Sequence, residues 1–145
     1  MDTLAPQSRR TGGEEMTVEW LDRTLTQCAY HYCLITSEDA FNKELDRIGL
    51  PPHKRSQWLS SDRHATTHHF IHEGKPCAIV CIKPEPEKYT GCQIAALLVH
   101  EAVHIWQRHA AYIGSHNDHG DEEEAYAIQN IAQALMESFR EARNE

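Results

Sequence analysis

The residues with the clearest chemical meaning are His100, Glu101 and His104, which form the pattern His-Glu-x-x-His. Side chains four residues apart lie on the same face of an α-helix, so the two imidazoles can bind one zinc ion together. The glutamate beside the first histidine can accept a proton from the attacking water. The pattern therefore predicts metal-assisted hydrolysis, with His100 and His104 as metal ligands and Glu101 as the general base.

Apolar residues surround this motif. Between Ile94 and Trp106 the ionisable side chains are those of His100, Glu101 and His104 alone. A helix that is apolar on nearly every side is expected to be buried, and an unpaired carboxylate is costly to bury. One interpretation is that both histidines are satisfied core residues, one of them paired with the glutamate. A divalent cation would compensate all three polar groups at once, and we favour this second interpretation.

A catalytic zinc ion usually has three protein ligands and one open position. A third histidine in the pattern H-E-x-x-H-x-x-G-x-x-H is excluded, because Gln107 and Ala110 occupy the glycine and histidine positions. His109 follows His104 by five residues and therefore lies on a different face of the helix. A carboxylate from the next helix is thus the candidate third ligand.

That next helix begins with the acidic run Glu122-Glu123-Glu124. The helix dipole favours carboxylates in a first turn, and Asp121 and Glu124 could form a capping pair. These effects account for two of the three glutamates. Helical phase slightly favours Glu124, which lines up with the apolar stripe through Ile128, and places Glu122 at the edge of that stripe. The spacing therefore leaves the choice between Glu122 and Glu124 open.

The segment His100–Gln107 followed by Glu122–Ile131 resembles the gluzincin metallopeptidases, which combine H-E-x-x-H with a downstream glutamate in the pattern E-x-x-A. It looks most like the small single-domain members found in bacteria and phages, over about a third of the chain. The resemblance implies a zincin-like fold, hydrolysis of peptide bonds, and a Zn²⁺ cofactor held by the two motif histidines and Glu122. Tyr126 departs from the pattern, because several of these families have aspartate after the alanine.

The predicted function is that of a zinc metallopeptidase, a hydrolase that acts on a peptide or protein substrate. Two other functions would use the same ligands: a zincin-fold protein without proteolytic activity, and a hydrolase of a peptidoglycan amide. His116 and His119 precede the ligand helix, and either could stabilise an oxyanion or bind the metal. A second metal site could be formed by histidines of a candidate strand, although surface positions are the simpler interpretation: His68, His69 and His72.

The composition argues against several other classes of protein. The formal net charge is −8, and the 14 lysines and arginines form no run, so nucleic acid is not an expected partner. No apolar stretch reaches about 18 residues, so no membrane span is expected. The five cysteines are odd in number and show no C-x-x-C spacing, which indicates reduced thiols in a cytoplasmic protein.

The length of 145 residues fits one domain, expected over residues 17–145 after a disordered N-terminal segment of residues 1–16. That segment lacks the apolar region of a secretory signal. The predicted elements are helix, strand, helix, hairpin, helix and helix: Thr17–Ala29, Tyr30–Thr36, Glu38–Ile48, Thr66–His72 with Pro76–Ile82, Thr90–Tyr112 and Asp121–Arg143. This order predicts a small α+β domain, with a short, mostly antiparallel sheet packed on helices.

Local signals mark several of these elements. Ser37 is a good N-cap and Gly49 a stop for the helix between them, and Thr90 with a glutamine three residues later fits a capping box. A short loop centred on Gly74 predicts the hairpin. By resemblance to zincins, the hairpin strand Pro76–Ile82 could provide the edge along which an extended peptide binds.

Overall fold

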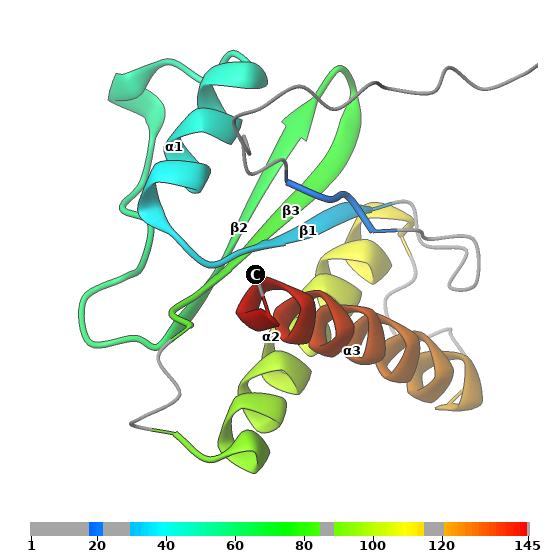
Figure 1. Cartoon of the computed structure of the whole chain (residues 1–145). Helices are drawn as coiled ribbons and strands as arrows, with labels where there is room; N and C mark the ends of the chain where they lie inside the picture. The colour runs from blue at the N-terminus through cyan, green and yellow to red at the C-terminus, as the bar shows by residue number, and fades with distance from the viewer. Residues whose placement is uncertain (1–17, 22–29, 85–88, 115–120, 145) are drawn as a thin grey trace, which may run out of the picture.

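Figure 1 shows the computed structural model of the chain, which describes residues 18–21, 30–84, 89–114 and 121–144. For Asp121 and Glu122 it describes the backbone alone. The N-terminal segment 1–16 and the two loop histidines, His116 and His119, lie outside the described residues. The described elements are β1 (His31–Ile35), α1 (Glu38–Arg47), a 3-10 turn (Pro52–Lys54), β2 (Ala65–His72), β3 (Lys75–Ile82), α2 (Gly91–Tyr112) and α3 (Asp121–Asn144).

The three strands form one mixed sheet in the order β1-β3-β2. β2 is antiparallel to β3, with His72 opposite Lys75, whereas β1 runs parallel to β3, with Cys33 opposite Ile79. The prediction of a mostly antiparallel sheet is therefore wrong for one of the two strand pairs. Parallel strands cannot be joined by a tight turn and need a crossover connection. The segment between β1 and the hairpin, which contains α1, is long enough to provide that crossover.

β3 is the central strand and is paired on both sides. Its side chains are buried from Pro76 to Ile82, because helices cover both faces of the sheet there. The prediction that this strand provides a free edge for a peptide is therefore wrong. β2 is an edge strand instead, and it is the strand that makes the most contacts with α2.

Helices cover both faces of the sheet, with α1 on one face and α2 and α3 on the other (Figure 1). Successive side chains of a strand point to opposite faces, so each strand contributes to two cores. The core on the α1 side contains Cys33, Ile35, Phe41, Leu45, Ile79 and Cys81. The larger core on the other side includes Tyr32, Leu34, Val80, Leu98, Ile105, Ile131 and Leu135. The expected α+β class is confirmed, as a three-stranded mixed sheet packed against three helices in the described part of the chain.

The hairpin turn consists of Glu73 and Gly74, with φ angles of 50° and 73°. Positive φ at both central residues is typical of a type I′ turn, whose twist matches that of the two strands it joins. This turn fixes the register of β2 against β3. As a result Thr67 and His69 face α2, while His68 lies on the α1 side against Phe41, with ring centroids 4.8 Å apart.

The prediction of a helix from Thr17 is wrong for residues 18–21, the described part of that segment. Trp20 forms an isolated antiparallel bridge with Cys33, and the Leu21 N–H donates to the Tyr32 carbonyl over 3.1 Å. Apolar residues spaced three apart fit a helix in isolation, but pairing with β1 satisfies the backbone and buries part of the indole. Residues 22–29 lie outside the described chain.

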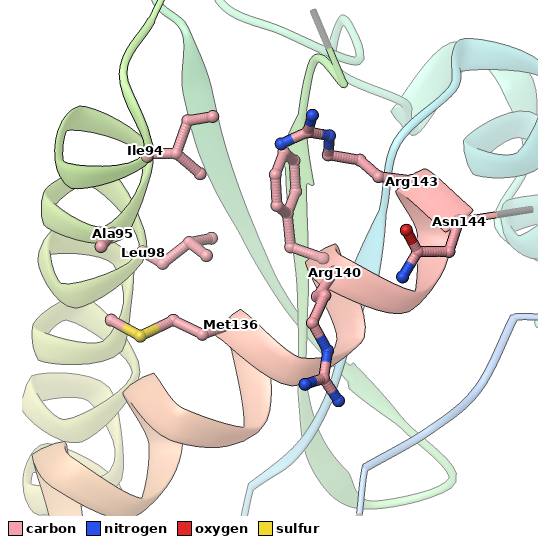
Figure 2. Close-up of a pocket in the computed structure, with 9 residues that line it drawn as sticks. Ile94, Ala95, Leu98, Met136, Arg140, Arg143 and Asn144 are labelled. Carbon is pink, nitrogen blue, oxygen red and sulfur yellow. The ribbon is translucent and has the colours of Figure 1, made fainter. Parts of the chain in front are cut away.

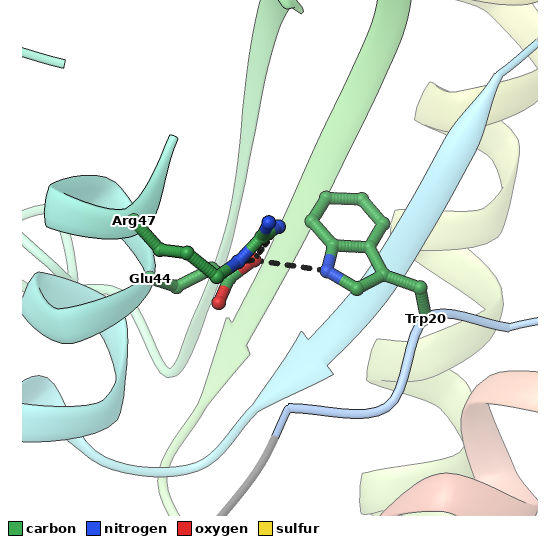
Figure 3. A network of polar contacts seen from close by, with 3 residues as sticks. All are labelled: Trp20, Glu44 and Arg47. Carbon is green, nitrogen blue, oxygen red and sulfur yellow. Dashed lines mark hydrogen bonds and ion pairs between the residues drawn. The ribbon is translucent and has the colours of Figure 1, made fainter. Parts of the chain in front are cut away.

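The extended segment also brings Trp20 to a buried carboxylate on α1 (Figure 3). The Trp20 indole N–H and the Arg47 Nε–H both donate to Oε1 of Glu44, each over 2.9 Å. Burial alone would raise the pKa of Glu44, but hydrogen bonds from Arg47 and Trp20 and the Arg47 charge outweigh it and lower that pKa. Glu44 therefore stays charged and holds residues 18–21 to α1 through Trp20.

The two long helices have the predicted ends and core stripes. α2 starts with the predicted capping box, in which the Gln93 N–H donates to Thr90 Oγ1 and the Thr90 N–H to Gln93 Oε1. In α3, Leu135 and Phe139 are buried as the periodicity predicts. Within the described residues, no helix combines the length and apolar character needed to cross a membrane.

Candidate functional site

His100 and His104 meet on the outer face of α2. Their Nε2 atoms are 3.1 Å apart and their rings are nearly perpendicular. Nδ1 of His104 lies 3.1 Å from Oε1 of Gln107, one helical turn further on. An amide oxygen accepts a hydrogen bond, so this contact keeps the proton on Nδ1 and leaves a lone pair on Nε2 of His104. The helix thus presents one oriented imidazole nitrogen beside a second.

The separation of these nitrogens fits two ligands of one ion. Zinc–nitrogen bonds of 2.0–2.1 Å in a tetrahedral site place two nitrogens about 3.3 Å apart. A metal-binding histidine usually donates its other ring N–H to an acceptor, and here the Gln107 side-chain oxygen takes that position beside His104. Without an ion the same geometry is a hydrogen bond from Nε2–H of His100 to Nε2 of His104. The pair is therefore competent to bind a metal.

The expectation that α2 is buried on nearly every side is wrong. His100 is exposed, His104 is partly buried, and Val99 is 38% exposed, because α2 packs on β2 and α3 with only part of its circumference. Glu101 is the one motif residue that is buried, with 4% of its surface exposed. The argument that burial demands a compensating charge therefore applies to Glu101 and not to the two histidines.

Glu101 points toward the edge strand. Its Oε2 accepts a short hydrogen bond from the hydroxyl of Thr67 on β2, and this is its one hydrogen bond among the described residues. The carboxylate also lines a cavity of about 310 Å³ between α2, β2 and the turn before β2. Other residues that line it are His104, Gln107, His69, Arg63 and Arg108. Glu101 therefore adjoins open space on the same side as His104.

His69 forms part of the wall of this cavity. Its Nδ1 is buried and has no hydrogen-bond partner among the described residues. Burial lowers the pKa of His69 to about 4, with further lowering by the charges of Arg108, His104 and His68. His69 is therefore a neutral wall residue at neutral pH.

A second metal site on β2, the less favoured interpretation of its three histidines, does not form among the described residues. Nε2 of His68 is 2.9 Å from the carbonyl oxygen of Trp58, and its Nδ1 is 3.2 Å from the Ser56 hydroxyl. His69 faces the opposite side of the sheet, as the strand alternation predicts. His72 lines a different cavity, beside α1.

The acidic start of α3 is only partly described. Oε1 of Glu124 accepts a hydrogen bond of 2.9 Å from the indole N–H of Trp106, which is buried. Trp106 follows His104 by two residues, a rotation of about 200° around α2. Glu124 thus joins α3 to the side of α2 that faces away from His104. The side chain of Glu122 lies outside the described residues, so its role as a ligand stays a prediction.

The described residues hold no cluster of three potential metal ligands from histidine, cysteine, aspartate and glutamate. Two of the three predicted ligands, His100 and His104, are together. The third, Glu122, is described only as a backbone position in the first turn of α3. His109 is buried against Trp106, away from the pair, as its position five residues after His104 predicts.

A second cavity, of about 380 Å³, lies between the start of α2 and the end of α3 (Figure 2). Its floor is apolar, and Arg140 and Arg143 stand at its rim. The Arg143 guanidinium lies 5.8 Å from the Phe139 ring centroid, a cation–π contact. None of the predicted site residues lines this cavity.

Comparison with models of protein families, with curated proteins and with solved structures found no match to this chain.

Three residues of the site were not predicted to belong to it. Gln107 follows His104 by three residues, and this helical spacing would have identified it as a neighbour of that histidine. Thr67 contacts Glu101 only because β2 packs on α2, and no local pattern signals such a contact. His69 was predicted to lie on a strand, but it lines the cavity only because α2 packs against its side of the hairpin.

Proposed function

We propose that this protein is a metal-dependent peptidase, with His100 and His104 as zinc ligands, Glu122 as the third, and Glu101 as the general base. The observation that carries the proposal is the arrangement on α2. Two imidazole nitrogens 3.1 Å apart stand beside a buried carboxylate that adjoins a cavity. When bound there, a zinc ion supplies Lewis-acid chemistry, lowering the pKa of a water molecule and polarising the scissile carbonyl.

The chain's own residues perform the proton transfers in this proposal. One oxygen of Glu101 is held by the Thr67 hydroxyl, which orients the carboxylate toward the attacking water. Glu101 accepts the proton from that water and later delivers it to the leaving amine. Gln107 holds His104 in the tautomer whose Nε2 binds metal.

The choice of Glu122 over Glu124 is also part of this proposal. Glu124 is engaged by Trp106 on another side of α2, which argues against a role as ligand. The E-x-x-A pattern favours Glu122. The outer edge of β2 pairs with no other described strand, and β2 contacts α2, so this edge is the place where an extended substrate could add main-chain hydrogen bonds.

The proposal is tested by the variant Glu101→Gln, assayed with a mixture of unstructured peptides and by elemental analysis. We expect the variant to keep about one zinc ion per chain and to lose peptide hydrolysis by at least about 100-fold, because an amide is no general base. The matched control is Glu137→Gln, an exposed position on α3 that should behave as wild type. Loss of zinc in Glu101→Gln, or full activity in it, would contradict the proposed roles.

A further inference from the structure

The cavity beside Glu101 is lined by two arginines, Arg63 and Arg108. Arg63 comes from the turn before β2 and Arg108 from α2, and the described residues offer neither of them an ion pair. Arg47 and Arg55, in contrast, each pair with a carboxylate on α1. Two arginines without an ion pair among the described residues therefore line one cavity in a protein whose net charge is −8.

The positions of these arginines are built by the fold. Arg108 follows His104 by four residues, so it lies one turn further along the same side of α2. Arg63 ends a turn in which its N–H donates to the Ser60 carbonyl over 3.1 Å, and the Ser60 N–H donates to Thr66 Oγ1 over 3.2 Å. The two arginines thus line the cavity from two different elements, the turn before β2 and α2.

The charge balance of the cavity is positive. Its described lining carries two guanidinium groups and one carboxylate, that of Glu101. Guanidinium groups bind carboxylates through paired, charge-assisted hydrogen bonds. A volume of about 310 Å³ is at the lower end of the range of small-molecule sites, about 300–1,000 Å³, so it suits one residue of a substrate.

We propose that this cavity binds a carboxylate group of the substrate between Arg63 and Arg108, next to Glu101. The inference deepens the proposed peptidase function by naming its substrate class, a peptide with a negatively charged residue at the site. That carboxylate is either the free C-terminus of the peptide or an aspartate or glutamate side chain. Both sources present the same chemistry to the two arginines.

The test measures binding of four synthetic peptides to the full chain after removal of metal with a chelator, by NMR titration of backbone amides. The pairs are acetyl-Ala-Ala-Ala with a free or an amidated C-terminus, and amidated acetyl-Ala-Glu-Ala or acetyl-Ala-Gln-Ala. We expect at least one acid to bind about tenfold or more tightly than its uncharged partner. The pair that shows the preference identifies the source of the carboxylate.

Charge-matched variants locate the preference. Arg63→Gln and Arg108→Gln, singly and together, should abolish it. Arg140→Gln with Arg143→Gln, at the rim of the other cavity, removes the same charge and should leave it unchanged (Figure 2). Both target arginines are exposed, so each single variant should fold even if the double variant does not.

Equal binding of acids and amides, or a preference that survives loss of both Arg63 and Arg108, would overturn the inference. Because binding is measured without metal, zinc cannot be the group that holds the carboxylate. The outcome is also independent of turnover. If the Glu101→Gln test fails, the peptidase proposal is wrong but the carboxylate-binding site can still stand. If the peptide titration fails, the peptidase proposal can still stand with a different substrate class.

Discussion

Glu44 and Glu101 are both buried carboxylates, but they lie on opposite sides of the sheet and differ in their partners. Glu44 accepts hydrogen bonds from an indole N–H and from a guanidinium group that also neutralises its charge. Glu101 accepts one hydrogen bond among the described residues, from the neutral hydroxyl of Thr67, and it lines a cavity.

In the proposed function, this difference separates a structural carboxylate from a reactive one. Glu44 is paired with a guanidinium group and also bonded to an indole, and these contacts hold α1 to neighbouring residues. Glu101 has a single neutral donor among the described residues, open space beside it and two imidazoles on the adjoining face, which is the arrangement that its proposed role as general base requires. Burial alone, which is nearly equal for the two residues at 6% and 4% exposure, does not distinguish them.

The largest expected effect comes from removing the metal. His100→Ala and His104→Ala should each abolish tight zinc binding, and a chelator should lower the melting temperature of wild type by about 10 °C or more, because ligand binding adds to native-state stability. Elemental analysis and thermal unfolding measure both. Glu44→Gln should show the same chelator effect as wild type. Full zinc occupancy in both histidine variants would refute the metal site.

The next effect concerns the first turn of α3. Glu122→Ala should lower zinc affinity by at least about 100-fold. This is more than the effect of removing a residue that contacts a ligand but not the metal itself. Glu124→Ala should leave zinc affinity unchanged and lower the free energy of unfolding by about 1–2 kcal/mol, since it removes the acceptor for the Trp106 indole. Zinc titration and urea unfolding separate the two. The reverse pattern would make Glu124 the third ligand.

A smaller effect is expected on the other side of the sheet. Glu44→Gln should lower the free energy of unfolding by about 1 kcal/mol at pH 7 without changing zinc content or turnover. The folded-state pKa of Glu44 is lowered, so its charge stabilises the protein above the ordinary value of 4.5. That stabilisation is lost as the pH falls through the folded pKa. Urea unfolding at several pH values should therefore show wild type and variant converging in acid.

The smallest effect is expected at Thr67. Thr67→Val keeps the shape of the side chain but removes the hydroxyl, leaving Glu101 buried without its donor. The free energy of unfolding should fall by about 1 kcal/mol, and Thr67→Ser should restore it. Turnover should fall in the valine variant and recover in the serine variant. If the valine variant changes neither stability nor turnover, the Thr67 hydroxyl does not orient Glu101. The single neutral donor would then not be what distinguishes Glu101 from Glu44.

Much of the local structure was predictable from the sequence. The Ser37 cap, the Thr90 capping box and the two-residue turn at Gly74 are short-range hydrogen-bond and φ preferences, so they act wherever the chain lies. The segment at Trp20 was mispredicted because apolar spacing is compatible with a helix. Pairing with β1, visible only in the assembled sheet, overrides that preference.

The features of the site also divide into those set by local sequence and those set by tertiary packing. The sequence by itself determined that His100 and His104 share a face, because residues four apart on a helix are neighbours whatever the helix packs against. Only the tertiary structure decided that Glu101 is buried while the histidines are not, since that depends on which side of α2 meets β2 and α3. The pairing of Thr67 with Glu101 across 34 residues also depends on that packing, as does the meeting of Arg63 and Arg108 at one cavity. Such contacts are decided by how whole elements bury their apolar faces, which a local pattern of residues does not encode.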